Sequence, residues 1–254
     1  MWSLLVGIGT AAFLQPFWMP ASALPDQAHA TDAPLVAGLV GAVAVFAVLV
    51  EVRRGTMNGA TVAMLGVLGA TTGLLRLLDL PAGGNAMFWV VLLVGAAFGA
   101  RFGFLLGMVG MVVGAALTGG FGPWLPFQML ASGGLGALAG GAGRASRSLP
   151  RVVQIGVLVA VGWIGAFAYG AVMDLWFWPY AISGGPLSWR PGLGLGGTLR
   201  HFWRFYVATS LAWDAAGAFA NAVAVAVLGP PVLATLRRFA DRLDPVVEIV
   251  PDPS

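Results

Sequence analysis

Residues 204–239 read RFYVATSLAWDAAGAFANAVAVAVLGPPVLATLRRF, and this stretch decides the fold class of the chain. Between Tyr206 and the pair Arg237-Arg238 it contains one charged side chain, Asp214. A membrane-crossing helix needs about 20 mostly apolar residues, so the stretch predicts such a helix. A carboxylate inside a membrane is costly unless it is paired or hydrated. We therefore expect Asp214 to face a bundle interior or a cavity.

The composition of the whole chain extends this prediction. Hydrophobic residues make up 59% of the 254 residues and charged residues only 9%, whereas a soluble domain has about 25% charged residues. So few charges cannot cover a globule of this size with polar surface. We expect an all-α, multi-pass protein of the cell membrane, with the lipid bilayer as its surroundings.

The apolar stretches predict eight membrane-spanning helices, with approximate bounds 2–19, 35–52, 57–77, 86–100, 102–118, 125–143, 151–177 and 202–229. A tight turn beside Arg101 is expected to separate the fourth and fifth. Cytoplasmic segments usually carry an excess of basic residues. If both termini are cytoplasmic, that side holds nine of the 13 arginines, namely Arg53, Arg54, Arg101, Arg144, Arg147, Arg151, Arg237, Arg238 and Arg242.

The expected organisation has three parts, namely two N-terminal helices in 1–56, a six-helix core in 57–235 and a cytoplasmic tail in 236–254. Ala28-His29-Ala30 resembles a signal-peptidase site. Residues 1–30 are therefore either a retained helix or a cleaved signal. The tail begins basic and ends acidic and Pro-rich, so we expect a short helix end followed by disorder.

Several kinds of chemistry are excluded by missing residue types. The chain has no cysteine, and all 13 basic residues are arginine. Without lysine there is no P-loop, so the chain cannot be an ordinary ATPase. With two histidines and no cysteine, we expect neither a metal site nor a cofactor, and we predict no enzymatic activity. The net charge of +3 arises from few charged residues. We interpret it as a sign of membrane topology and not of binding to nucleic acid.

Small residues in the third predicted span form two overlapping pairs, Gly66 with Ala70 and Gly69 with Gly73. Small residues four apart allow close approach of another helix. The pattern fits packing within the chain or docking of a partner.

Candidate ligand-binding residues gather at the expected outer ends of the later spans. Trp124 and Gln128 follow the turn GGFGP, and the Gln128 amide needs a partner, either a ligand or the protein. Tyr169 and Asp174 lie toward the outer end of the seventh span. In the last span, Ser210, Asp214, Gly217 and Asn221 share one helical face.

An outer loop is predicted at 178–200, rich in glycine, proline and aromatic residues. It is either a lid packed onto the protein or an interfacial loop. Aromatic side chains with a few charges, including Trp178, Arg190 and Arg204, suit an organic ligand. They also suit an ordinary interfacial belt.

The stretch GFGPWLPFQMLASGGLGALAG at 120–140, taken with 204–239, resembles the substrate-binding S component of an energy-coupling factor (ECF) vitamin transporter, closest to actinobacterial members. The resemblance covers about 57–239 and implies a six-helix core, to which the two N-terminal helices are an addition. S components bind a vitamin near the outer face and recruit a transmembrane scaffold with two ATPases. The family's helix-docking surface would correspond to Gly66, Ala70 and Gly73, with glycine in place of alanine.

The sequence thus predicts the substrate-binding subunit of an ECF-type importer for a micronutrient, of either cobalamin or thiamine-like size. The residues expected to line or border the site are Trp124, Gln128, Tyr169, Asp174, Trp178, Arg190, Arg204, Tyr206, Ser210 and Asp214. The alternative is a stand-alone secondary transporter or channel in which Asp214 is a proton or cation site.

Overall fold

The computed structural model describes residues 58–80, 84–122, 124–181 and 185–243, with a few single residues between 7 and 53. The predicted spans at 2–19 and 35–52, the choice between helix and signal for 1–30, and the tail beyond 243 lie outside the described residues.

Within these ranges the fold is almost entirely helical. The helices are α3 Gly59–Leu75, α4 Met87–Phe98, α5 Ala100–Thr118, α6 Leu125–Ala145, α7 Arg151–Ala181, α8 Gly194–Thr209 and α9 Leu211–Leu243. Two short antiparallel strands, β1 Asp79–Leu80 and β2 Gly84–Asn85, pair Asp79 with Asn85 between α3 and α4. The predicted spans from 57–77 to 151–177 agree with α3 to α7 to within a few residues, except at the far end of α7.

Among the described residues, three helices are long and apolar enough to cross a membrane: α5, α7 and Leu211–Arg242 of α9. In α7 and α9 most of the spanning residues are not buried inside the protein. Apolar side chains that face outward over two such helices are typical of contact with lipid. This is the architecture of an integral membrane protein.

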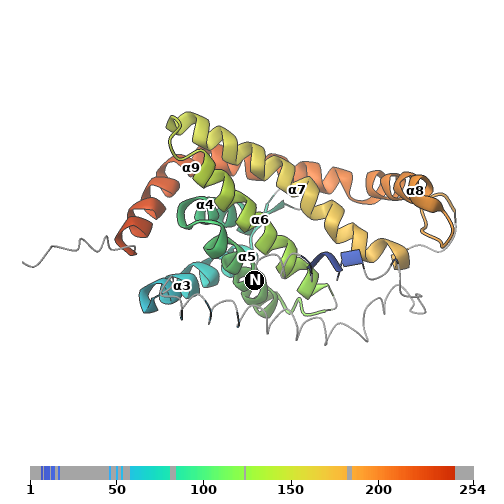
Figure 1. Cartoon of the computed structure of the whole chain (residues 1–254), viewed down its shortest axis with the longest axis horizontal. Helices are drawn as coiled ribbons and strands as arrows, with labels where there is room; N and C mark the ends of the chain where they lie inside the picture. The colour runs from blue at the N-terminus through green and yellow to red at the C-terminus, as the bar shows by residue number, and fades with distance from the viewer. Residues whose placement is uncertain are drawn as a thin grey trace, which may run out of the picture.

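The long helices α7 and α9 lie side by side, with α4 and α6 packed against them, α5 packed on α4 and α6, and α3 packed on α5 (Figure 1). The α8 helix lies at one end of the molecule, next to the end of α7, whereas the C-terminal part of α9 lies at the opposite end (Figure 1). The fully buried side chains of the core come mainly from α4 and α5, with Met87, Leu92, Leu93, Leu105 and Leu106 among them.

Glycine lets the central helices touch through their backbones. A Cβ on Gly136 of α6 or on Gly103 of α5 would collide with the backbone of the facing helix. Such contact between small residues is how membrane helices approach closely. A tight turn separates α4 from α5 as predicted, but it lies at Gly99, where φ is +93°, and Arg101 is the second residue of α5.

The predicted single helix at 202–229 is wrong at both ends. The chain kinks at Ser210, where φ is −119°, and this separates α8 from α9. At the other end α9 continues through Pro230 and Pro231 to Leu243. Membrane helices tolerate proline inside their length.

The predicted loop at 178–200 is also partly wrong, because α7 runs on to Ala181 and α8 begins at Gly194. Trp178 is fully buried and donates its indole N–H to the Leu187 carbonyl at 2.7 Å. His201 Nδ1 lies 2.9 Å from the Ser188 carbonyl. These two contacts hold the described part of the connection against the end of α7 and the side of α8.

Candidate functional site

Asp214 lies in the first turn of α9, where Tyr206 of α8 reaches its carboxylate. The Tyr206 hydroxyl donates to Asp214 Oδ2 at 2.7 Å. Burial, and then the hydrogen bond to Asp214, raises the pKa of the Tyr206 phenol above its usual value. The phenol therefore stays protonated and remains a donor to the carboxylate. This bond ties α8 to α9 across the kink at Ser210.

The same carboxylate rests against the backbone of α7 at Gly170. A Cβ on Gly170 would overlap both oxygens and the carboxyl carbon of Asp214. Gly170 is therefore required for the close approach of the charged group, and not for an unusual backbone conformation. Tyr206 on one side and Gly170 on the other fix where the carboxylate lies.

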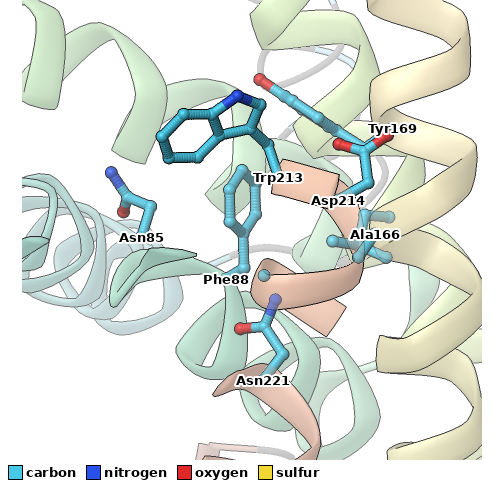
Figure 2. Close-up of a pocket in the computed structure, with 9 residues that line it drawn as sticks. Asn85, Phe88, Ala166, Tyr169, Trp213, Asp214 and Asn221 are labelled. Atoms are coloured by element: carbon cyan, nitrogen blue, oxygen red, sulfur yellow. The ribbon is translucent and has the colours of Figure 1, made fainter. Parts of the chain in front are cut away.

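A cavity of about 160 Å³ opens beside Asp214 (Figure 2). Side chains from α4, α6, α7 and α9 line it, with one from β2. They are Asn85, Phe88, Leu135, Ala166, Tyr169, Trp213, Asp214, Gly217 and Asn221.

Three aromatic side chains form much of the cavity wall. Phe88 and Tyr169 are in edge-on contact with ring centroids 5.0 Å apart, and Trp213 lies beside Phe88 in Figure 2. Trp213 is 63% exposed, so the cavity wall at this point also faces the surroundings of the protein. Flat aromatic walls favour a flat ligand or a cation held over a ring.

The polar groups of the lining are one carboxylate, two amides and one phenol hydroxyl, from Asp214, Asn85, Asn221 and Tyr169. Asn221 is only 4% exposed, and its Oδ1 has no hydrogen-bond partner in the described part of the chain. Asn85 uses its Oδ1 to accept the backbone N–H of Met87 at 3.0 Å and thus holds the start of α4. A buried acceptor without a donor is costly, and a ligand N–H would remove that cost.

A second carboxylate, Asp174, lies one turn beyond Gly170 on α7. One of its oxygens, Oδ2, is buried without a hydrogen-bond partner among the described residues. Its electrostatic neighbours are Ser210 and Asp214. The predicted residues Asp174, Ser210 and Asp214 therefore do gather at one place, beside the cavity and at the junction of α8 and α9.

The predicted pair Trp124 and Gln128 does not line this cavity. Gln128 accepts a hydrogen bond from Arg76 Nη2 at 3.3 Å, and Arg76 Nη1 donates to the Met111 carbonyl at 3.3 Å. The amide thus has a partner inside the protein. Trp124 is 41% exposed and donates to the Gly120 carbonyl at 3.3 Å, within its own turn.

The aromatic and basic residues predicted at the outer mouth are also away from the cavity. Trp178 packs on Phe202 with ring centroids 5.3 Å apart, while Arg190 and Arg204 are exposed. Of the ten predicted residues, Tyr169 and Asp214 line the cavity, whereas Tyr206, Asp174 and Ser210 lie behind Asp214.

The proposed docking residues of α3 lie along one side of the helix but are not equally accessible. Gly66 and Ala70 are exposed, and a Cβ on Gly66 would meet nothing within 4 Å. Gly73 is buried, and a Cβ at this position would collide with Val113 and the backbone of Gly114. Gly69 is buried against Val109 of α5 in the same way. The second pair of small residues therefore serves packing within the chain.

Sequence reasoning left most of the cavity lining out of the predicted site. Gly217 and Asn221 could have been found, because they share the helical face of Asp214. Trp213 is adjacent to Asp214 in sequence but points about 100° away on a helix, so periodicity separates the two. Asn85 and Phe88 come from another part of the chain, and no local pattern connects them with α9.

Within the described residues, no group of three His, Asp or Glu side chains lies close enough together to hold a metal ion. Comparison of the chain with protein-family models finds no match, and neither curated proteins nor solved structures give one.

Proposed function

We propose that this chain is the membrane-embedded substrate-binding subunit of an ECF-type importer, and that it binds a single-ring, nitrogen-containing cation of the size of one ring of a thiamine-like heterocycle. The observation that supports this most is the cavity itself. It combines three aromatic walls with the carboxylate of Asp214 and the unpartnered acceptor of Asn221. No arginine is among the described residues that line it, so the lining favours a positive ligand that carries N–H donors.

The size of the cavity favours a small ligand over a cobalamin. A cavity of about 150 Å³ in a protein interior holds one benzene molecule, and the present cavity has a similar volume of about 160 Å³. One six-membered or five-membered heterocycle fits this space, whereas a corrin macrocycle is several times larger. We therefore choose the smaller of the two ligand classes that the sequence left open.

Energy for uptake has to come from other chains in this proposal. The sequence has no lysine and hence no P-loop, so a transmembrane scaffold and two ATPase subunits would drive the transport. The proposed topology has eight spans with both termini cytoplasmic and a six-helix S-component-like core. Gly66 and Ala70 of α3 remain candidates for contact with the scaffold.

Binding is tested on the purified protein in nanodiscs. Small molecules that co-purify are identified by mass spectrometry, and a cationic aminopyrimidine is then titrated by calorimetry against its neutral, uncharged isostere. We expect the cation to bind at least about 10-fold more tightly, and Asp214→Asn to remove that preference, since one lost charge interaction of about 1.4 kcal/mol is a factor of 10. The control is Asp241→Asn, because Asp241 is an exposed carboxylate at the other end of α9.

Equal binding of the two heterocycles, or no binding of either, would contradict the proposed ligand class. Transport is tested separately, by uptake of the labelled ligand in cells that contain the chain with and without the scaffold and ATPases. Binding without any uptake that depends on these subunits would contradict the role in import while leaving the binding site in place.

The second candidate function is a proton or cation carrier, which the pair Asp174 and Asp214 favours. Asp174 has a buried oxygen without a hydrogen-bond partner in the described residues and lies in the electrostatic range of Asp214. Carboxylates inside a membrane commonly mark proton pathways. If the pure protein conducts protons in liposomes and Asp214→Asn abolishes the flux, this function replaces the first.

A further inference from the structure

The α8 helix presents a row of exposed apolar side chains at intervals of four residues. These are Leu195 at 78% exposure, Leu199 at 58%, Trp203 at 60% and Val207 at 44%, and we call them the outer stripe. Residues four apart lie on one side of a helix. The outer stripe is thus a continuous apolar surface that nothing in the described part of the protein covers.

The other sides of α8 have a different character. Phe205 and Tyr206 are each only 4% exposed and face the protein, where Phe202 also packs on Trp178. Arg200 and Arg204 are exposed and lie next to the outer stripe. The sequence of α8 contains two arginines, a histidine and no acidic residue. The helix therefore has a protein side, an apolar side and a basic side.

The lengths of the helices decide where α8 can lie. The α9 helix has 33 residues, which at 1.5 Å per residue gives about 50 Å. The hydrocarbon core of a bilayer is only about 30 Å thick, so α9 crosses it without help from α8. Because α8 directly precedes α9, it lies at or beyond the edge of the hydrocarbon core. Surrounded by water alone, it would expose the whole outer stripe.

We propose that α8 lies flat in the membrane interface, with the outer stripe in the boundary between headgroups and acyl chains and with Arg200 and Arg204 against headgroup phosphates. Helices with an apolar face, a basic face and aromatic residues bind membrane surfaces in this way. Tryptophan prefers this depth, and arginine can extend its guanidinium toward the headgroups. The surroundings of α8 in this arrangement are phospholipid, and not another protein or water.

The chain lacks cysteine. A single introduced cysteine can therefore be labelled at one chosen position without first removing any native cysteine. Leu195→Cys, Leu199→Cys and Val207→Cys are labelled with an environment-sensitive fluorophore in the full-length protein in vesicles. Lipids with quenchers at known depths then give the depth of each label. The positions 195 and 207 are 12 residues apart, or about 18 Å along a helix axis.

A flat helix places the labels at 195 and 207 at nearly equal depth, just below the headgroups, which is the expected result. A membrane-crossing helix would separate their depths by most of that length, and this result would overturn the proposal. The three substitutions are on an exposed face, so folding is not expected to suffer. Circular dichroism of each variant checks this.

A matched label on the basic side of α8 distinguishes a helix in the membrane interface from a helix surrounded by water. Ala208 is exposed and lies one turn after Arg204, so Ala208→Cys faces away from the stripe. We expect quenching by aqueous iodide to be roughly two-fold or more stronger at 208 than at 199, as for the two faces of an interfacial helix. Equal iodide quenching at both positions would make α8 a water-exposed lid and would refute the membrane contact.

The arginines are tested in the Leu199→Cys protein by the double substitution Arg200→Gln and Arg204→Gln. If the guanidinium groups hold the helix at the phosphates, iodide quenching at 199 increases when both charges are removed, and more so in vesicles that contain phosphatidylglycerol. Unchanged quenching would show that the arginines do not contact phosphates. Neither result depends on which ligand the cavity binds.

Discussion

The polar side chains near the two ends of α9 differ in how their hydrogen-bonding groups are paired. Near the C-terminal end, Gln154 of α7 is 6% exposed and its amide is fully engaged. It donates to the carbonyls of Leu149 at 2.7 Å and Arg147 at 3.1 Å, and it accepts from Arg237 at 2.6 Å. Near the N-terminal end, Asp214 has Tyr206 as its hydrogen-bond donor, and Asn221 and Asp174 have buried oxygens without partners in the described residues.

This difference distinguishes a polar cluster that stabilises the fold from one that we propose binds a ligand. The Gln154 amide satisfies the corner between α6 and α7 and joins it to α9, and the unpaired buried group at this end of the described chain is a donor, Arg237 Nη2. The Asp214 end leaves acceptors unused next to an open cavity, at a cost to the free protein that a ligand with N–H donors would remove. We therefore expect substitutions at the first end to change stability and substitutions at the second to change binding.

The largest effect is expected from Gln154→Ala. It leaves two carbonyls and the Arg237 guanidinium without their partner, and each buried group left unpaired costs about 1–3 kcal/mol. We expect a loss of about 3 kcal/mol in the free energy of unfolding, measured by thermal melting in detergent, with unchanged ligand affinity. The matched control is Gln128→Ala, because Gln128 accepts a single longer bond from Arg76. An equal loss in both variants would remove the contrast between the two ends.

The next effect is expected from Gly170→Ala at the binding end. The new methyl group overlaps the Asp214 carboxylate, and inserting atoms into a packed region costs about 1–3 kcal/mol. We expect both lower stability and lost binding, measured by melting and calorimetry. Gly156→Ala on the same helix is the control, since its Cβ would meet nothing within 4 Å. There alanine should stabilise α7 by up to about 1 kcal/mol.

A smaller effect is expected from Tyr206→Phe. It removes one hydrogen bond to a carboxylate and keeps the packing of the ring, so binding should weaken by about 1–2 kcal/mol, which is roughly 5-fold to 30-fold. A double-mutant cycle with Asp214→Ala tests the assignment. If Tyr206 acts through Asp214, its substitution should have little further effect once Asp214 is alanine. Additive effects would show that Tyr206 acts elsewhere.

The smallest effect is expected from Arg147→Gln. The ion pair between Arg147 and Asp241 spans 3.2 Å, but both side chains are more than 60% exposed. Exposed pairs contribute about 0–1 kcal/mol, so melting should hardly change. A loss as large as that of Gln154→Ala would mean that the ion pair, and not the buried amide, joins α9 to the corner of α6 and α7.

The sequence was sufficient for the features that depend on local pattern. Apolar length predicted α3 to α7 closely, and the isolated charge of Asp214 predicted its position beside a cavity. The kink at Ser210 was missed because Thr209 and Ser210 mark it without a glycine or proline, and the separate α8 was missed with it. Phe88 and Asn85 join Asp214 only through tertiary packing, which no periodicity in α9 records. Gln128 was correctly seen to need a partner, yet Arg76 comes from another helix.

The short α4 helix has a consequence for water. Its 12 residues extend for only about 18 Å, which is far less than the thickness of the hydrocarbon core. If Arg101, which is exposed near the start of α5, lies at the membrane surface, the other end of α4 falls within the bilayer, and so does the strand Gly84–Asn85 before it. Non-helical backbone at such a depth is tolerated where it is buried in protein or lines a hydrated cavity. Asn85 of this strand pair lines the cavity beside Asp214, so we expect hydrated space at this depth.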